Sequence, residues 1–306
     1  MPNRDSTTHR YWKLAFIVAM AVVYARMYLL LYPSVGSGGA PFAAATAIFA
    51  GWWFGIRGGL VVSVLLGLEN LLLLRFSLAL NWHTILEHGN FAGFVALVII
   101  GGAVGHMGNL SRKVKTYTEL LQYEAFHDPL TRLPNRALFY DRLEHAMARV
   151  ARGTNSVALL FLDLDGFKQI NDRYGHLAGD RLLAAFAERL SGTLRLGDTF
   201  ARLGGDEFVI LLEDVLDLNA AEVAAERLEA KLRQPFTIDD SEIAITASIG
   251  IAFRESGFHR PEDLLLDADR AMYRAKTSGK ARHQIFHPDQ PQTAQPSTRV
   301  LGAIGD

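Results

Sequence analysis

The chain has 306 residues, with 31 Lys and Arg against 32 Asp and Glu, and half of its residues are hydrophobic. The near-zero net charge argues against a nucleic-acid-binding protein, because neutralising phosphates requires a basic surface. The absence of cysteine excludes disulfides, thiol catalysis and zinc–thiolate sites.

Charged residues divide the chain into two parts. Residues 1–110 contain 6 Lys or Arg and 3 Asp or Glu, which leaves 25 and 29 for the remaining 196 residues. Lipid suits the first composition and water suits the second. The sequence therefore predicts a membrane region followed by a soluble domain, and excludes a wholly soluble protein, a secreted disulfide-rich domain and a collagenous or disordered chain.

The N-terminal part contains four apolar runs, near residues 14–32, 41–56, 58–74 and 91–107. At ~1.5 Å per residue, the first run reaches across a hydrocarbon core of ~30 Å. The second and third are separated by little beyond Arg57 and predict a tight helical hairpin. A cleaved signal peptide is the alternative for the first run, but that run is long for such a segment and three more follow it. We therefore predict a multi-pass transmembrane region of about four helices over residues 1–109, embedded in a lipid bilayer.

The distribution of positive charge predicts the orientation of this region. Arg75 alone lies between the third and fourth runs, whereas the other flanking cations fall on the opposite side: Arg4, Arg10, Lys13, Arg57, Arg112, Lys113 and Lys115. The positive-inside rule then places both termini in the cytoplasm.

Two charged residues lie inside the apolar runs, Arg26 in the first and Glu69 in the third. Charges in lipid are costly unless they pair or serve a pathway. Arg26 is the thirteenth residue of its run and Glu69 the twelfth, so they are expected at similar depth. We predict an intramembrane ion pair between them that holds helices together or senses a ligand; the alternative is that Arg26 extends to the headgroups.

Residues 110–126 predict a connector helix that leaves the membrane. Leu110, Val114, Tyr117 and Leu121 follow a 4-3-4 spacing and so form one apolar stripe. Packing against a partner helix in a homodimer and packing within the chain both fit this pattern.

From residue 127 to 287 the sequence alternates between helical and strand patterns, which favours an α/β or α+β domain. A helix is expected over residues 137–152 and a buried strand over residues 157–162. This strand leads into Asp163 and Asp165, which lie two positions apart and therefore project from one face of an extended chain.

A second acidic element follows at Gly204-Gly205-Asp206-Glu207, between strand-like residues 199–203 and 208–212. Two glycines in a short connection predict a β-hairpin turn. If this hairpin pairs beside the 157–162 strand, Asp163 and Asp206 converge. Clustered carboxylates without cysteine suit Mg²⁺ or Mn²⁺, and such sites are typical of phosphoryl and nucleotidyl transfer.

These motifs resemble those of the GGDEF family of diguanylate cyclases. The signature Arg202-Leu-Gly204-Gly205-Asp206-Glu207-Phe208 stands among further motifs in the family's order, over about residues 125–287. The further motifs are Asp128-Pro-Leu-Thr131 with Leu133-Pro-Asn-Arg136, Phe161-Leu-Asp163-Leu-Asp165-Gly-Phe167-Lys168, Asn171 with Gly175-His176 and Gly179-Asp180, Ser248-Ile-Gly250-Ile, and Ala268-Asp-Arg-Ala-Met-Tyr-Arg-Ala-Lys276. A set of this size is far more specific than one glycine-rich turn.

The resemblance implies an α+β fold of ferredoxin-like β-α-β-β-α-β topology, as in nucleotide cyclases and polymerase palms. It also implies that a homodimer condenses two GTP into cyclic di-GMP, with the 3′-hydroxyl of each nucleotide attacking the α-phosphorus of the other. By the same resemblance Asp163, the Leu164 carbonyl and Asp206 bind Mg²⁺ or Mn²⁺. Glu207 supports that site and counts with Asp163 and Asp206 as catalytic. The bacterial inner membrane, with the cyclase domain in the cytoplasm, is the implied location.

The resemblance also assigns contacts to GTP. Asn171 and Asp180 are expected to bind the guanine edge. Contacts to the phosphates are expected from the amides of Phe167 and Lys168, from close backbone approach at Gly204 and Gly205, and from Lys276 and Lys280. Many relatives have arginine where this chain has Lys280, so we expect modestly weaker GTP binding. A solvated helix end is the alternative for both lysines.

Arg195-Leu-Gly-Asp198 matches the R-x-x-D of the family's product-inhibition site, five residues before the two glycines. Product feedback is therefore expected. Residues 288–306 are rich in Gln, Pro, Thr and Ser and predict a disordered tail. A domain that binds GTP or cyclic di-GMP without turnover is the alternative function, although Asp163, Asp206 and Glu207 are all intact.

Overall fold

The computed structural model describes residues 4–35, 41–77, 79, 81, 83, 90–153, 155–255 and 260–288. The chain divides into two compact units, Met1–Leu120 and Leu121–Asp306, and the division falls inside the predicted connector. Each unit is described by itself. The predicted tail, apart from residue 288, lies outside the described residues.

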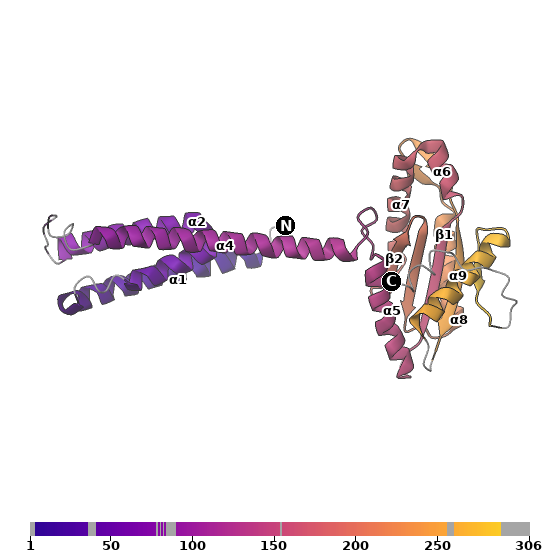
Figure 1. Ribbon diagram of the computed structural model, residues 1–306, viewed down its shortest axis with the longest axis horizontal. Coiled ribbons are helices and arrows are strands. Elements are labelled where there is room, and N and C mark those ends of the chain that lie inside the picture. The colour runs from indigo at the N-terminus through magenta and orange to yellow at the C-terminus, as the bar shows by residue number, and fades with distance from the viewer. Residues whose placement is uncertain are drawn as a thin grey trace. The chain divides into compact units, whose positions relative to one another are not determined.

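The N-terminal unit is helical (Figure 1). Its elements are α1 (Arg4–Val35), α2 (Pro41–Leu72), a short π-helix η2 (Leu73–Ser77) and α4 (Asn90–Phe126), the last of which continues into the second unit. Within the part of the chain that the structure describes, three helical stretches are long and apolar enough to cross a membrane: Tyr11–Leu30, Ala43–Phe76 and Phe91–Phe126. The predicted membrane region is thus supported, but the count of four separate helices is not.

The predicted hairpin lies inside α2. Gly55 has non-helical backbone angles, φ 74° and ψ −166°, within this element. A Cβ added to Gly59 would lie 3.0 Å from the Cα of Gly51. In a straight helix, eight residues span ~12 Å, so the chain must reverse at Gly55. The second and third apolar runs therefore form the two arms of one bent element.

Glycines allow the two arms of α2 and the helix α4 to meet backbone to backbone. A Cβ on Gly59 would lie 2.1 Å from the carbonyl oxygen of Gly101, and a Cβ on Gly51 would lie 2.9 Å from the same oxygen. A Cβ on Gly105 would approach Ile56 Cα to 2.6 Å. Close contact through small residues is the usual way in which helices associate in lipid, where burial of apolar surface supplies little force.

Two of the predicted cytoplasmic cations, Arg112 and Lys13, lie at one end of this unit. The Arg112 guanidinium donates to the carbonyl of Trp52 at 2.7 Å and to Asn109 Oδ1 at 2.7 Å, beside the reversal at Gly55. Lys13 Nζ lies 5.8 Å from the centre of the Trp53 ring. The start of α1, the α2 reversal and the middle of α4 therefore share one end, which agrees with the predicted sharing of one membrane side.

The predicted ion pair between Arg26 and Glu69 is not formed. Arg26 is exposed and Glu69 is half-buried, and among the described residues no ion pair joins them. The polar contact in this region instead runs from the Tyr24 hydroxyl to Asn70 Oδ1, at 3.3 Å. The prediction considered only how far along its run each residue lies. It did not consider the rotation of the helix about its axis, which directs Arg26 away from the bundle.

The C-terminal unit is built on a five-stranded sheet in the order β2-β3-β1-β6-β7. The strands are β1 (Val157–Leu164), β2 (Thr199–Gly204), β3 (Glu207–Glu213), β6 (Ala247–Arg254) and β7 (His283–Ile285). β1 is antiparallel to both β3 and β6, β2 is antiparallel to β3, and β7 joins β6 in parallel. Strands β2, β3, β1 and β6 have the order and directions of the predicted ferredoxin-like topology.

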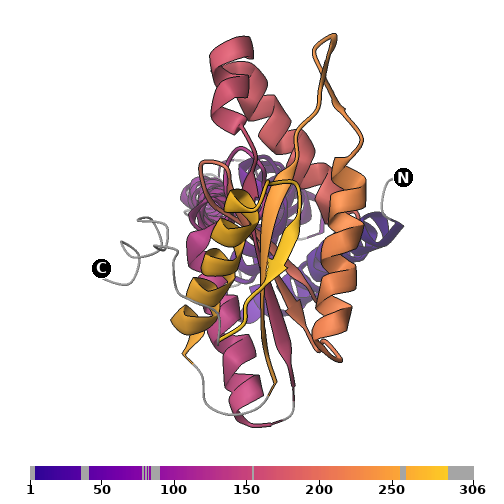
Figure 2. The same cartoon turned by 90° about the vertical axis from the view of Figure 1, so that its right-hand side faces the viewer.

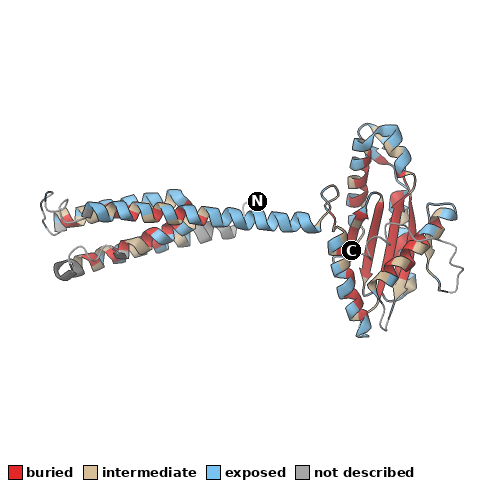
Figure 3. Ribbon diagram, viewed as in Figure 1, coloured by how far each residue is buried: buried red, intermediate tan, exposed pale blue. Residues whose placement is uncertain are grey.

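Helices cover both faces of this sheet (Figure 2). They are α5 (Arg136–Ala151), α6 (Phe167–Tyr174), α7 (His176–Ser191), α8 (Leu218–Leu232) and α9 (Pro261–Thr277). One apolar core lies between the sheet and α7 and α8, and the other lies between the sheet and α5 and α9. Every residue of β1 is buried, as expected for a central strand (Figure 3). A small hairpin, β4 (Phe236–Ile238) with β5 (Ser241–Ile243), precedes β6.

The apolar stripe of the connector is uncovered. Leu110, Val114, Tyr117 and Leu121 are each more than half exposed. Among the described residues, no other element packs over them, so the packing within the chain that the sequence also allowed is not seen.

Gly59→Ala should destabilise the N-terminal unit, because its Cβ meets the backbone of Gly101 rather than a flexible side chain. Overpacking of this kind costs about 1–3 kcal/mol. Gly93→Ala is the matched control, since a Cβ there meets nothing within 4 Å. Thermal stability in detergent, followed by size-exclusion chromatography, should fall only for Gly59→Ala. Equal behaviour of the two variants would contradict the backbone contact.

Candidate active site

The site begins where β1 leaves the core. In the register of the sheet, Asp163 stands opposite Glu207 of β3 on one side and Ser248 of β6 on the other. The amide of Leu164 donates to the carbonyl of Asp206 at 3.3 Å. The predicted convergence of Asp163 with the Gly-Gly-Asp-Glu turn is therefore observed.

The turn between β2 and β3 depends on glycine. Gly204 and Gly205 have φ values of 142° and 57°, which side chains with a Cβ rarely adopt. The ladder between β2 and β3 shifts register between Arg202 and Gly204. Space around Gly204 is open, with nothing within 4 Å of an added Cβ. A ligand can thus approach the backbone of the turn.

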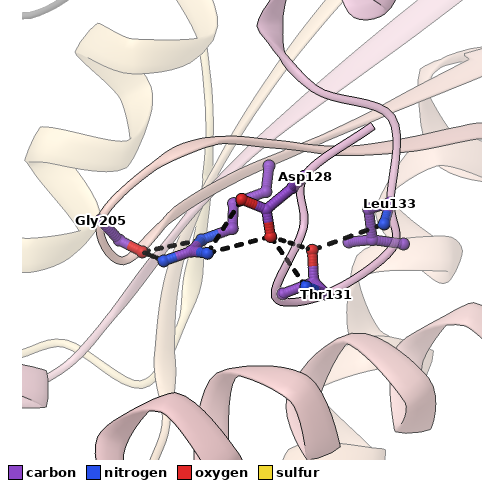
Figure 4. Close-up of polar contacts among 5 residues, drawn as sticks. Asp128, Thr131, Leu133 and Gly205 are labelled. Atoms are coloured by element: carbon purple, nitrogen blue, oxygen red, sulfur yellow. Dashed lines mark hydrogen bonds and ion pairs between the residues drawn. The ribbon is translucent and has the colours of Figure 1, made fainter. Parts of the chain in front are cut away.

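Arg202 fastens this turn to the start of the domain (Figure 4). Its guanidinium donates twice to the Gly205 carbonyl, at 3.0 and 2.8 Å, and to both carboxylate oxygens of Asp128, at 3.0 and 3.1 Å. Asp128 also accepts from the amide and hydroxyl of Thr131 at 2.8 and 2.7 Å. Hydrogen bonds to Thr131 and the charge of Arg202 outweigh burial and hold the pKa of Asp128 below its usual range.

The Asp163 carboxylate is buried and carries an unusual charge balance. Burial raises its pKa to about 6, and the nearby Asp206 and Asp165 act in the same direction, against the Lys276 ammonium. Lys276 Nζ lies 2.7 Å from Asp163 Oδ2. Lys276 therefore supplies the positive charge that this carboxylate requires.

The donor set suits a hard divalent cation. Asp163 and Asp206 offer carboxylate oxygens and Leu164 offers a backbone carbonyl, and a cation already lies against Asp163 in the form of Lys276. Among the described residues, no three His, Asp or Glu side chains form a ready-made metal cage. Mg²⁺ is commonly held by one or two carboxylates, with substrate phosphates and water completing its shell. The residues present fit that mode of binding.

The amides of Phe167 and Lys168 open helix α6 directly after the acidic strand end. Gly166, the residue before the helix, has φ 79°, which turns the chain sharply. The amide of Gln169 donates to the Gly166 carbonyl at 2.9 Å, and the amides of Phe167 and Lys168 precede this bond in the chain. Helix N-termini attract phosphate, so this position fits the phosphate contact that the resemblance implies for these two residues.

Asn171 has a buried acceptor and a space beside it. Its Oδ1 is buried without a hydrogen-bond partner in the described chain. A Cβ on Gly179 would lie 1.9 Å from this oxygen, so the glycine makes room for the carboxamide. Asp180, the next residue on α7, is exposed. An unsatisfied buried acceptor is costly, and a ligand N–H would satisfy it.

The remaining predicted residues lie around these elements. Lys280 is exposed on the turn between α9 and β7. Arg195 and Asp198 form a small turn, in which the Arg195 amide donates to Asp198 Oδ2 at 2.9 Å. Both line a surface pocket together with Arg227 of α8.

Sequence reasoning missed the roles of Arg202, Asp165 and Gly179. Each belongs to a motif named above. Arg202 and Asp165 act through hydrogen bonds to residues far away in the sequence, and Gly179 acts by leaving room for the Asn171 side chain. A charged residue inside a strand next to a glycine turn was the available signal for Arg202, and Arg227 had no signal at all.

A comparison with protein families decides the relationship of this chain. The profile described as "Diguanylate cyclase, GGDEF domain" matches residues 125–282. The chain belongs to the GGDEF family. Its GGDEF domain contains the strand end, the turn and the α6 N-terminus described above.

Two curated relatives come from Pseudomonas aeruginosa. The bifunctional diguanylate cyclase/cyclic di-GMP phosphodiesterase MucR is 45% identical over 183 residues, which cover 60% of this chain and 26% of MucR. The diguanylate cyclase TpbB is 39% identical over 184 residues, which cover 60% of this chain and 42% of TpbB. The matched region thus spans less than half of either relative.

Solved structures resemble the GGDEF domain. The isolated GGDEF domain of TpbB from Pseudomonas aeruginosa is 40% identical, with a TM-score of 0.50, and the match covers 53% of this chain and 94% of that one. The coiled coil and GGDEF domain of DgcB from Caulobacter crescentus, in complex with c-di-GMP, is 26% identical, with a TM-score of 0.56 and coverage of 60% and 97%.

Asp163→Asn should stabilise the cation-free protein at neutral pH. The folded-state pKa of Asp163, about 6, lies above the ordinary value of 3.8, so folding favours the protonated form. The stability that this group contributes is present below pH 4 and is lost as pH rises through 6, by about 2–3 kcal/mol. In EDTA at pH 7.5, thermal unfolding of the GGDEF domain should shift upward in the variant, and the difference should vanish near pH 4.

Asp240→Asn, at an exposed aspartate of the β4–β5 turn, is the matched control and should show no such pH-dependent difference. A constant difference between Asp163→Asn and the unchanged protein from pH 4 to 7.5 would contradict the raised pKa.

Proposed function

We propose that the protein is a membrane-anchored diguanylate cyclase that condenses two GTP into cyclic di-GMP as a homodimer. The observation that carries the proposal is the sheet register, which sets Asp163 beside Asp206 and opposite Glu207 at the start of the α6 N-terminus. Carboxylates and free amides at one strand end fit a metal-bound triphosphate.

The site residues divide the work of nucleotidyl transfer. Asp163, the Leu164 carbonyl and Asp206 would hold Mg²⁺ or Mn²⁺, which when bound neutralises triphosphate charge and stabilises the transition state. Glu207 supports Asp163 across the β1–β3 ladder. The amides of Phe167 and Lys168 bind phosphate oxygens. When nucleotide enters, Lys276 exchanges its contact with Asp163 for the phosphates, and Lys280 adds a second positive charge.

The reaction forms one phosphodiester bond per GTP. The 3′-oxygen of each nucleotide attacks the α-phosphorus of the other, its proton passes to solvent, and the bond from that phosphorus to pyrophosphate breaks. Two such events close the ring and release two pyrophosphates. Since each subunit holds one GTP, two domains must face each other.

Guanine is selected by Asn171 and Asp180. The buried Oδ1 of Asn171 is an acceptor without a hydrogen-bond donor. The edge of guanine presents an N–H group to such an acceptor, whereas adenine has no N–H group at the same position. The carboxylate of Asp180 supplies a further acceptor. Gly204 and Gly205 let the backbone of the turn lie close to the nucleotide.

The connector stripe supplies the dimer contact. Leu110, Val114, Tyr117 and Leu121 are exposed with heptad-like spacing, as in a two-stranded coiled coil. In this proposal the apolar helices of the N-terminal unit anchor the protein in the bacterial inner membrane, and the cations at their shared end support a cytoplasmic GGDEF domain through the positive-inside rule.

Product formation by the full-length protein in lipid nanodiscs tests this function. With GTP and Mg²⁺, cyclic di-GMP and pyrophosphate should appear in a ratio of one to two. Asp206→Ala should lower the rate at least about a hundredfold, because charge stabilisation at the reacting phosphate is removed. Asp240→Asn, an exposed acid on the β4–β5 turn, is the control and should keep its activity. Tight cyclic di-GMP binding without turnover would instead indicate a receptor.

Arg195 and Asp198 are the residues that we assign to product feedback inhibition. They line a surface pocket together with Arg227, whose guanidinium is the second one in this pocket. Arginine binds phosphate and guanine edges in a bidentate manner, and a carboxylate accepts from guanine N–H groups. A dianionic product with two guanines fits this combination.

Arg195→Ala should relieve feedback. Losing a charge-assisted hydrogen bond of about 1.5–3 kcal/mol raises the concentration of cyclic di-GMP that halves the rate at least about tenfold. Arg233→Ala, at an exposed arginine ending α8, is the control. Initial rates without product should stay unchanged in both. Unaltered inhibition of the Arg195→Ala variant by cyclic di-GMP would contradict the assignment of this pocket to product inhibition.

A further inference from the structure

Asp165 makes more contacts than any role assigned above requires. It lies on the turn after β1, two residues beyond Asp163. Its Oδ2 accepts from the Thr246 hydroxyl at 2.7 Å and from the Ala281 amide at 3.0 Å, and its Oδ1 accepts from the Ser248 hydroxyl at 2.7 Å. Its own amide donates to the Thr246 carbonyl at 2.9 Å. Three donors thus already engage the carboxylate.

The segment that Asp165 holds through Ala281 is strained. Gly279, Lys280 and Ala281 have φ values of 116°, 61° and 50°, so three successive residues are left-handed. Two of them carry a Cβ, which disfavours this conformation. The turn is retained by few bonds, among them the Lys280 amide to the Ala275 carbonyl at 3.0 Å and the Ala281 amide to Asp165.

This strained turn carries Lys280 to the end of β1. Lys276, one helical turn earlier in the chain, already contacts Asp163 at 2.7 Å. The contact between Ala281 and Asp165 brings the backbone next to Lys280 to the same strand end. Without this hydrogen bond, the left-handed residues would relax, and the backbone position from which the Lys280 side chain extends would no longer be fixed.

We propose that Asp165 is a positioning residue that holds the Gly279–Arg282 turn so that Lys280 meets the terminal phosphates of GTP. The inference rests on the proposed cyclase function. Asp165 acts through hydrogen bonds, since Thr246, Ser248 and Ala281 already take up three of the about four acceptor positions of its carboxylate.

Substitution by alanine and by asparagine separates the two roles. Asparagine can accept from Ala281 and Thr246 through its oxygen and donate to the Ser248 hydroxyl, so it replaces the hydrogen bonds without the charge. In the full-length protein in nanodiscs, Asp165→Ala should raise the KM for GTP about tenfold, a loss of about 1.4 kcal/mol of binding, with little change in kcat. Asp165→Asn should stay within about threefold of the unchanged protein.

A double-mutant cycle tests whether Lys280 is the residue positioned. In a Lys280→Ala background, Asp165→Ala should raise KM less than about twofold, because residues that act as a unit are not additive. Ala281→Gly should partly restore the KM of Asp165→Ala, since glycine adopts positive φ without help. Hydrogen exchange of residues 279–282 should quicken in Asp165→Ala and not in Asp165→Asn, a readout that needs no turnover.

Four outcomes would overturn the inference: an Asn variant as impaired as the Ala variant, additive effects of Asp165 and Lys280, no rescue by Ala281→Gly, or unchanged exchange in the turn. If Asp165→Ala does not fold, Thr246→Val with Ser248→Ala removes two of the three donors and should raise KM by about threefold. Absence of turnover in the unchanged protein, with the exchange pattern intact, would reject the proposed function alone.

Discussion

The register of β1 is the constraint on which the candidate site depends. All eight residues of β1 are buried, and the strand is paired along both edges. A slip of one residue would exchange the two faces of the strand and move the Asp163 side chain to the opposite side of the sheet. The two apolar cores, one on each face, oppose such a slip. Packing far from the chemistry therefore fixes which acid stands beside the Gly-Gly turn.

The sequence predicted the local features of the fold better than contacts across the chain. The buried strand, the hairpin with two glycines and the α2 reversal followed from apolar runs and from glycine, which act within a few residues. The pair of Arg26 with Glu69 was wrong because depth along a helix does not determine rotation about its axis. The contacts of Asp165 join residues 81 to 116 positions apart, and that of Arg202 with Asp128 joins residues 74 apart. Such contacts depend on the finished topology, and no periodicity reports them.

The site illustrates how stability is set against chemistry. Placing Asp163 in a buried position near Asp206 and Asp165 raises its pKa and makes its charged form unfavourable. Lys276 offsets part of this cost in the cation-free protein. The same desolvation strengthens the attraction between the carboxylate and any cation that replaces the lysine. Under the proposed function, Lys276 pairs with Asp163 before nucleotide binding and the divalent cation takes its place afterwards, whereas an apolar residue instead of Lys276 would leave the buried acid unpaired in the cation-free protein.

A short chain of hydrogen bonds ties the entrance of the GGDEF domain to its Gly-Gly turn. Asn135, which caps α5, donates from its amide to the Phe126 carbonyl at 2.9 Å and from its side chain to the Ala125 carbonyl at 2.8 Å, at the last turn of α4. The amide of Arg202 then donates to the Pro134 carbonyl at 3.0 Å, and its guanidinium joins Asp128 to Gly205 (Figure 4). A displacement of the end of α4 must either break these bonds or carry the turn with it. Because Asp206 directly follows Gly205, the acid at the centre of the site is one residue away from the last bond of this chain.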